Sequence, residues 1–217
     1  METTLNEIEC RVLGSLVEKE LATPDYYPLT LNSLMTACNQ KSNRHPMMRL
    51  EEAEVVQACD SLKRKHLVLT AFGSGRVPKY RHLLYEKLKW EPDEQALIAE
   101  LLVRGPQTIG ELKGRAERMA EMGDLAAIEV LLDELAERDI LIKLSLQPGR
   151  KEQRYAHLFS GEPVISDEGV FAPQQQARHR AILDNERLAV LEEEVRLLRA
   201  EMAEIRKALQ EFKCQFE

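Results

Sequence analysis

Two stretches of the chain, about seventy-five residues apart, follow one pattern, and this repeat limits the possible folds more than any other feature. The first copy covers residues 29–34, 60–69, a Gly-Ser-Gly-Arg turn at 73–76 and residues 79–83. The second covers residues 107–112, 133–142, a Pro-Gly-Arg turn at 148–150 and residues 154–158. Each copy predicts helix, short helix, longer helix, strand, glycine-containing turn and strand. That order is the winged-helix plan, a helix-turn-helix with a β-hairpin appended. The repeat favours a duplicated binding module over a single catalytic pocket.

The predicted fold class is mainly α with small β-hairpins, arranged as tandem winged-helix domains followed by a C-terminal coiled-coil helix. A chain of 217 residues is long enough for two small domains and an extension. We place the domains at residues 1–90 and 91–160, a linker at 161–173 and the coiled-coil helix at 174–217. Helices are expected over 5–20, 31–39, 51–66, 91–104, 109–121 and 124–138, and strands over 67–72, 79–85, 140–146 and 153–159.

The distribution of charge says more than the net charge of −7. Residues 1–90 carry 13 Lys and Arg against 11 Asp and Glu, whereas residues 91–160 carry 9 against 14. An acidic chain removes the simplest argument for nucleic-acid binding without excluding it. No apolar run approaches the roughly 20 residues of a membrane span, and the N-terminus lacks the basic and apolar regions of a signal peptide. We therefore expect a cytoplasmic protein.

The cysteines predict neither a disulfide nor a metal site. Cys10, Cys38, Cys59 and Cys214 lie far apart without a CxxC pair, and the five histidines supply no zinc-ligand spacing. Three of the four cysteines fall on predicted apolar helix faces, where a free cysteine behaves as a small buried hydrophobe. We expect them to pack in the core.

No catalytic motif is present. The chain has no glycine-rich phosphate loop before a helix, no HExxH and no GxSxG. The turn at residues 73–75 is better explained as a hairpin tip than as a phosphate cradle. Tyr26 and Tyr27 beside Asp25 suggest a small pocket, but this segment more readily holds a loop against the core. We expect a protein without enzymatic activity, cofactor or small-molecule substrate.

Apolar residues in the C-terminal segment alternate spacings of three and four, as in a coiled coil. With Leu188 at position a, the side chains at position g of one helix and at the following position e of its partner have opposite charges in a parallel pair. In some antiparallel registers Glu194 of one helix would instead meet Glu201 of the other. We favour a parallel homodimer, and the alternative is an amphipathic helix docked on its own domains. The predicted dimerisation residues are Leu188, Leu191, Val195, Leu198, Met202, Ile205, Leu209 and Phe212.

The third helix of each repeat is unusually acidic for a DNA reader. In a winged helix this element enters the major groove, where Arg, Lys, Ser, Thr, Asn and Gln are the usual contacts. Acidic residues near a helix N-terminus complement its dipole but repel phosphates. Helix capping and solvated charge therefore explain these side chains well, and they count against standard groove reading. The residues are Glu51, Glu52, Glu54 and Gln57 in the first repeat, and Asp124, Glu129, Asp133 and Glu134 in the second.

Positive charge gathers in loops. A long polar connection follows the second helix, and both predicted wings have basic residues that suit contacts with a duplex backbone and minor groove. Basic loops are also often no more than solvated surface. The candidate nucleic-acid contacts are Asn39, Gln40, Lys41, Asn43, Arg44 and Arg49 in the connection, Arg76, Lys79, Arg81, Arg150 and Lys151 in the wings, and Arg115 and Arg118 on the second repeat's short helix.

Several segments resemble the hallmarks of the YceH family of bacterial proteins. The run LATPDYYPLTLN at residues 21–32 leads into ACNQKSNR at 37–44, and further matches lie at 110–119 and 154–162. With the C-terminal heptads, the resemblance covers essentially the whole chain. It implies a tandem winged-helix protein without an established biochemical function and supplies no catalytic residues. Because residues 39–44 lie in the family signature, they are the leading functional candidate.

These observations predict a non-enzymatic homodimer that uses paired winged helices to bind a macromolecule. DNA is the favoured ligand, held by the wings and by residues 39–49. The alternative is a protein adapter, in which the acidic third helices and the pair Met47 and Met48 meet a basic or apolar partner.

Overall fold

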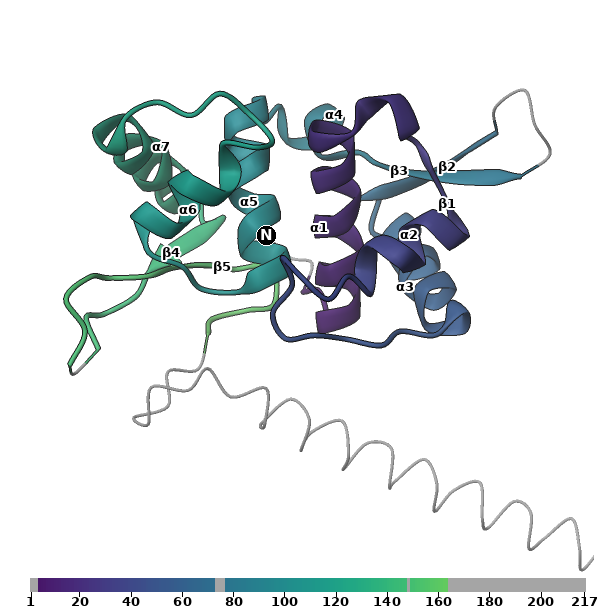
Figure 1. Cartoon of the computed structure of the whole chain (residues 1–217), viewed down its shortest axis with the longest axis horizontal. Coiled ribbons are helices and arrows are strands. Elements are labelled where there is room, and N and C mark those ends of the chain that lie inside the picture. Colours follow the sequence, from purple (N-terminus) through teal and green to yellow (C-terminus); the bar gives the residue numbers. More distant parts are fainter. Residues whose placement is uncertain (1–3, 73–76, 148, 164–217) are drawn as a thin grey trace, which may run out of the picture. The chain divides into compact units, whose positions relative to one another are not determined.

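A computed structural model describes residues 4–72, 77–147 and 149–163, which belong to one compact unit that ends at Pro163. The predicted coiled-coil helix, with all its proposed dimerisation residues, lies outside the described residues, as does most of the predicted linker. Within the described part, helices and small antiparallel sheets make a mixed α/β fold (Figure 1). No helix of this part is both long and apolar enough to cross a membrane.

The first repeat, up to residue 90, contains helices packed beside a three-stranded sheet. The sheet has the order β1–β3–β2, with both neighbouring pairs antiparallel. Its elements are α1 (Glu7–Ala22), a 3-10 turn (Pro24–Tyr26), β1 (Leu29–Thr30), α2 (Leu31–Cys38), α3 (Glu52–Arg64), β2 (Val68–Phe72), β3 (Pro78–His82) and α4 (Leu84–Leu88).

The second repeat, from residue 91 to 163, has the same order with a shorter sheet. Strands β4 and β5 pair antiparallel, with Leu141 opposite His157. The elements are α5 (Pro92–Arg104), α6 (Ile109–Ala116), α7 (Leu125–Glu137), β4 (Leu141–Lys143) and β5 (Tyr155–His157). Both hairpin strands are shorter than the sequence predicts, and the predicted helix over 109–121 ends at Ala116.

The two repeats have the same backbone pairing and the same helix cap before their second helices. Leu29, just before α2, pairs with Tyr80 of β3, and Gln107, just before α6, forms an isolated bridge with Tyr155 of β5. A threonine then caps each following helix, because Thr30 and Thr108 accept hydrogen bonds from backbone amides three residues later. The two repeats therefore share a strand pairing as well as an element order.

The turn after the third helix is also the same in both repeats. His66 follows α3 with φ of 57°, and Asp139 follows α7 with φ of 54°. The next residue in each repeat returns to the helix, where Leu67 N donates to Leu62 O and Ile140 N donates to Leu135 O. These equivalent turns start β2 and β4 and support duplication of one structural unit.

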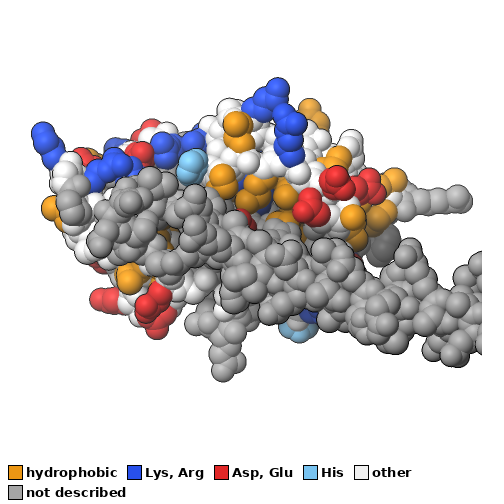
Figure 2. Space-filling model, turned by 90° about the horizontal axis from the view of Figure 1, so that it is seen from below, with side chains coloured by type: hydrophobic (Ala, Val, Ile, Leu, Met, Phe, Trp, Pro, Cys, Tyr) orange, Lys and Arg blue, Asp and Glu red, His pale blue; other side chains and the backbone are white. Residues whose placement is uncertain are grey.

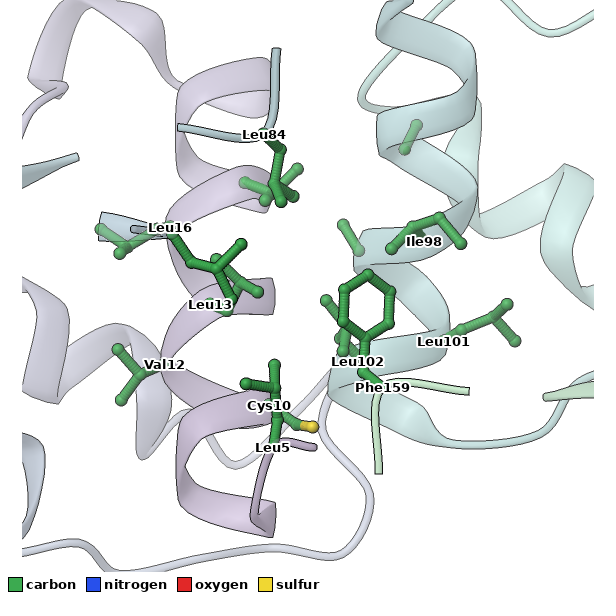
Figure 3. Close-up of a cluster of buried hydrophobic side chains, with 14 of the residues drawn as sticks. Leu5, Cys10, Val12, Leu13, Leu16, Leu84, Ile98, Leu101, Leu102 and Phe159 are labelled. Carbon is green, nitrogen blue, oxygen red and sulfur yellow. The ribbon is translucent and has the colours of Figure 1, made fainter. Parts of the chain in front are cut away.

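The two repeats share a hydrophobic core in which α1 packs against α5. Figure 3 shows Leu13 and Leu16 of α1 facing Ile98 and Leu102 of α5, with the Phe159 ring between the helices. Gly14 permits this close approach, since a Cβ there would lie 2.7 Å from Leu102 Cβ. Apolar side chains from both repeats are therefore buried in the same hydrophobic core.

The predicted boundary near residue 90 does not fall in an exposed linker. Trp90 is fully buried, and its ring meets Phe159 edge to face with centroids 6.1 Å apart. The short helix α4 also fills this region, where the sequence predicts only the end of a strand. The connection between the repeats is thus part of the core.

Candidate macromolecule-binding surfaces

The connection between α2 and α3 is the leading functional candidate, and its two ends are joined by one side chain. Asn39 Nδ2 donates to Leu50 O at 2.8 Å, and Leu50 N donates to Asn39 Oδ1 at 2.7 Å. An amide side chain satisfies both backbone groups in this way. Asn39 therefore closes the connection, which we call the α2–α3 loop (residues 39–50).

Arg44 fixes the middle of the α2–α3 loop by pointing inward. Its Nη1 lies 2.6 Å from Glu18 Oε2, and its Nε donates to Ala37 O at 3.0 Å. The side chain has no exposed surface. The backbone amide of His45 also donates to Val103 O of α5, at 2.9 Å. The loop is consequently fastened to both repeats.

A network of buried charges lies where the repeats meet. It joins Glu18 of α1 and Glu100 of α5, whose side chains are 1% and 0% exposed. Arg118 bridges them, with Nη1 3.1 Å from Glu18 Oε1 and Nη2 2.8 Å from Glu100 Oε1. Arg104 Nε lies 2.8 Å from Glu100 Oε2. We call Glu18, Glu100, Arg44, Arg104 and Arg118 the junction network.

The arginines beside Glu18 lower the pKa of its carboxyl group. Burial alone would raise the pKa of Glu18, but Arg44 and Arg118 beside it outweigh burial and hold the pKa below its ordinary value. Arg104 extends the network into the α2–α3 loop, because its Nη2 donates to Asn43 Oδ1. Ion pairs thus link five charged side chains from α1, the loop, α5 and the segment after α6.

Several of the predicted nucleic-acid contacts are therefore engaged within the protein. Asn39, Asn43, Arg44 and Arg118 hold the loop and the junction. Arg115 donates to Gln107 Oε1 and lies 3.3 Å from Glu111. Arg81 pairs with Glu86 at 2.6 Å on the surface. A guanidinium held by a carboxylate has less positive charge to offer a phosphate.

The remaining predicted contacts reach solvent at separate places. Lys41 and Arg49 are exposed in the α2–α3 loop, and Arg150 and Lys151 are exposed between β4 and β5. Gln40 and Lys79 are half-buried, and Arg76 lies outside the described residues. In Figure 2, blue Lys and Arg side chains gather at the upper left and upper centre, with red Asp and Glu at the right and lower left. The uncovered part of that face has no continuous basic stripe.

The acidic residues at the start of α3 cap the helix. Glu51 N donates to Glu54 Oε2 at 2.9 Å, and the Glu51 side chain accepts from the N3 backbone, so the two form a capping box. In α7, Asp124 Oδ1 accepts from Ala127 N at 2.9 Å. The helix-capping interpretation is confirmed for these three side chains.

The exposed side of α7 is acidic and apolar. Leu125 and Val130 are 50% and 59% exposed, which is high for aliphatic side chains. Glu129 pairs with Lys143 at 3.2 Å, whereas neither Asp133 nor Glu134 forms an ion pair with a described residue. We define the α7 outer face as Leu125, Ala126, Glu129, Val130, Asp133, Glu134 and Glu137.

A pocket of about 160 Å³ adjoins the α7 outer face. The side chains of Met122, Ile128 and Leu131 make it apolar, and the carboxylates of Asp93 and Glu134 stand among its lining residues. The complete lining is Asp93, Met122, Gly123, Ala127, Ile128, Val130, Leu131 and Glu134. We call it the α7 pocket.

Sequence reasoning missed both the junction network and the α7 pocket. The signal for the network was present, because Glu18 and Glu100 fall among the apolar positions of their helices and a buried carboxylate requires a partner. The pocket had no comparable signal, since it depends on how the segment before α7 packs against the start of α5.

The described cysteines are buried free thiols. Burial raises the pKa of Cys10 to about 12, of Cys38 to about 11 and of Cys59 to about 12. At neutral pH these groups are protonated thiols and poor nucleophiles. Among the described residues, no group of three or more His, Cys, Asp and Glu side chains is placed to hold a metal ion.

Comparison with known proteins places the chain in a family without assigning it an activity. Residues 5–150 match a family model described as a protein of unknown function, DUF480. The chain belongs to the DUF480 family. It is 60% identical to a UPF0502 protein of Geobacter sulfurreducens, 58% to one of Geotalea daltonii and 56% to one of Geotalea uraniireducens, each over the full length of both chains. The YceH resemblance thus leads to an uncharacterised bacterial family, as expected, although the YceH name itself stays a prediction.

Proposed function

We propose that this DUF480 protein is a non-enzymatic cytoplasmic adapter that binds a protein partner through the α7 outer face. One observation carries the proposal: every side chain of that face is acidic or apolar, and two of its aliphatic residues are at least half exposed. Exposed apolar side chains rimmed by charge are typical of protein interaction sites. A basic partner with apolar anchors would match both properties.

The repeated backbone supports two winged-helix modules as the scaffold. In each repeat a helix pair is followed by a longer helix and a hairpin, and a short extended segment before the second helix pairs with the last strand. On this plan α3 and α7 are the helices that would enter a DNA groove. Carboxylates at those positions would face phosphates and lower the affinity for DNA.

Homodimerisation through residues 188–212 completes the proposal. The heptad pattern would supply an apolar seam, and a dimer would present two copies of the α7 outer face. Two linked sites raise the apparent affinity for a multivalent partner. Analytical ultracentrifugation of the full chain against Leu191→Asp with Leu198→Asp tests this part, with monomer expected for the variant.

A second candidate function is DNA association, favoured by four exposed cations. Lys41 and Arg49 lie in the α2–α3 loop, and Arg150 and Lys151 lie between β4 and β5. Such residues could contact phosphates without groove reading. Fewer cations are available to DNA than the sequence suggests, because Arg44, Arg115 and Arg118 are paired with carboxylates of the same chain.

Affinity purification from bacterial extract tests the adapter proposal. Tagged full-length protein is compared with Val130→Arg plus Glu134→Arg, which reverses the character of the α7 outer face. Arg150→Glu plus Lys151→Glu is the matched control at another exposed site. The proposal requires a partner that the first variant loses, the control retains and the purified proteins reproduce. Identical partner sets for all three proteins would sink it.

A further inference from the structure

We propose that the α7 pocket receives one aliphatic side chain of a short basic helix in the protein partner, whose lysines and arginines lie against the carboxylates in and beside the pocket. The inference rests on the proposed function, because it takes the α7 outer face to be the partner's binding surface. It adds the anchoring point, the secondary structure and the charge of the segment that the partner presents.

The α7 pocket lies along one side of α7 and has room for an aliphatic side chain. Its volume is about 160 Å³, and an apolar cavity of about 150 Å³ holds a group as large as benzene. Ile128 in the lining is 1% exposed, whereas Val130 is 59% exposed. An inserted Leu or Ile would therefore bury apolar surface on both sides of the contact. The lining residues that share one side of α7, at spacings of three and four, are Ala127, Val130, Leu131 and Glu134.

Carboxylates in and beside the pocket are not matched by cations of the described chain. Arg138 lies one turn after Glu134, but its Nη1 is 2.5 Å from Glu94 Oε1. Lys143 is likewise paired with Glu129. A cation of the partner would be attracted by several carboxylates at once. Those that form no ion pair with a described residue are Asp93 and Glu134 in the pocket and Asp133 and Glu137 on the α7 outer face.

The two ends of the α7 outer face differ in character, which sets the order of side chains in the partner. The half from Leu125 to Val130 carries the exposed aliphatic side chains, and the half from Asp133 to Glu137 carries the unpaired carboxylates. Residues 125 and 137 are about 18 Å apart along the helix axis at 1.5 Å per residue. A matching segment therefore has an aliphatic anchor at one end and Lys or Arg one or two helical turns away.

The geometry of α7 favours a helix as the bound segment over an extended strand. The backbone amides and carbonyls of α7 are hydrogen-bonded within the helix, so this face has no strand edge with which a peptide could pair. An extended peptide would leave its own backbone groups without protein partners. An amphipathic helix satisfies them internally and presents its anchors at spacings of three and four.

Selection from a display library of random peptides, each as long as α7, gives the first test. The library is selected on the full-length protein and counter-selected on Val130→Arg plus Glu134→Arg. The inference predicts surviving peptides with one aliphatic anchor and at least two Lys or Arg within two turns of it. They should also become helical on binding, as measured by circular dichroism. Survivors that are acidic, extended or without an aliphatic anchor would overturn the inference, as would the absence of survivors.

Filling the α7 pocket tests the anchor at a single position. Ala127 is exposed and lines the pocket, so Ala127→Phe occupies the space of the anchor and Ala127→Ser leaves it open. The affinity for the selected peptides should fall at least about tenfold with Phe and less than about threefold with Ser, because only Phe prevents burial of the anchor. Circular dichroism checks that both variants are folded. Equal affinities for the two variants would overturn the inference.

Removing the unpaired charges tests the basic part of the peptide. Asp93→Asn plus Glu134→Gln should weaken binding about tenfold at about 50 mM salt, and much less at about 500 mM, because salt screens exposed charges. Glu152→Gln plus Glu162→Gln changes two exposed carboxylates elsewhere and is the control with the same change in net charge. Equal weakening by both pairs at low salt would show that net charge alone attracts the peptide, contrary to the inference.

The inference and the proposed function fail separately. If the affinity purification above finds a partner that depends on the α7 outer face but binds Ala127→Phe and Ala127→Ser equally, the inference is refuted and the adapter function stands. If the selected peptides meet every expectation but no cellular protein depends on the α7 outer face, the peptide preference of the pocket stands and the adapter function is refuted.

Discussion

Gly14 of α1 lies directly against Leu102 of α5, at a point where an added Cβ would be 2.7 Å from Leu102 Cβ and 2.8 Å from Val103 Cγ1. The contact brings the first helices of the two repeats together. Because these helices share buried side chains, we expect the repeats to unfold as one cooperative unit. Partner binding would then act on a rigid body of two modules.

Replacing Gly14 tests the close packing of α1 and α5. Alanine is ordinarily about 1 kcal/mol better than glycine inside a helix, but a Cβ at this position requires the helices to separate. We expect Gly14→Ala to lower the free energy of unfolding by about 1–3 kcal/mol, the usual cost of overpacking. Gly114→Ala in α6 is the control, because a Cβ there meets nothing within 4 Å. Equal stabilisation of both variants in urea melts would contradict the shared core.

The buried ion pair of Arg44 and Glu18 gives the second prediction. Arg44→Ala should destabilise the protein by about 3 kcal/mol or more, since it leaves a buried carboxylate with fewer partners. Arg49→Ala, at an exposed position of the same loop, should change stability by no more than about 0.5 kcal/mol. Urea denaturation followed by circular dichroism measures both. Similar midpoints for the two variants would show that Arg44 has no structural role.

His157 predicts a loss of stability in mild acid. Burial lowers its pKa from 6.5 to about 4, and its Nδ1 is buried without a hydrogen-bond partner. Between these values the unfolded chain binds the proton and the folded protein does not, so stability falls as pH decreases from 6.5 towards 4. His157→Gln should flatten this part of the curve of unfolding free energy against pH. If the substitution left the slope of unfolding free energy against pH unchanged, His157 would not be the cause of the acid sensitivity.

The Asn39 side chain gives a prediction for the family-signature loop. Asn39→Ala removes both hydrogen bonds to Leu50, so we expect a loss of about 1–3 kcal/mol in the free energy of unfolding. Proteolysis should then begin within residues 39–50, because the two ends of the loop are no longer joined. Gln40→Ala is the neighbouring control, because the Gln40 side chain forms no hydrogen bond with a described residue. Protease resistance equal to wild type would contradict the closing role of Asn39.

Much of the fold was predictable because local signals agree with it. Thr108 followed by Glu111 is a capping-box pattern, and α6 begins at Ile109 as expected. Pro92 at the start of α5 likewise marks the predicted helix. These features depend on neighbouring residues, so a single sequence contains them. The short strand β1 was not predicted, because two residues pairing with distant β3 leave no periodic pattern.

The candidate site was less predictable because side-chain direction is a tertiary property. Arg44 lies in a polar, basic stretch that suggests solvent exposure, yet its guanidinium points to Glu18 on another helix. Arg118 similarly joins α1 and α5 in place of facing a ligand. The acidic character of α7, by contrast, was visible in the sequence. What the sequence lacked was the adjoining apolar pocket, whose lining residues come from separate segments.

Fluorescence anisotropy of the full-length protein with a labelled random-sequence duplex tests protein binding against DNA binding most directly. The titration is made at about 50 and 200 mM salt, where phosphate contacts produce a large difference in affinity. We predict no micromolar binding at either salt concentration, because the third helices are acidic and several arginines are held internally. Micromolar or tighter binding at low salt that collapses at high salt, and is lost with Lys41→Glu plus Lys151→Glu, would contradict the adapter proposal and establish the DNA alternative.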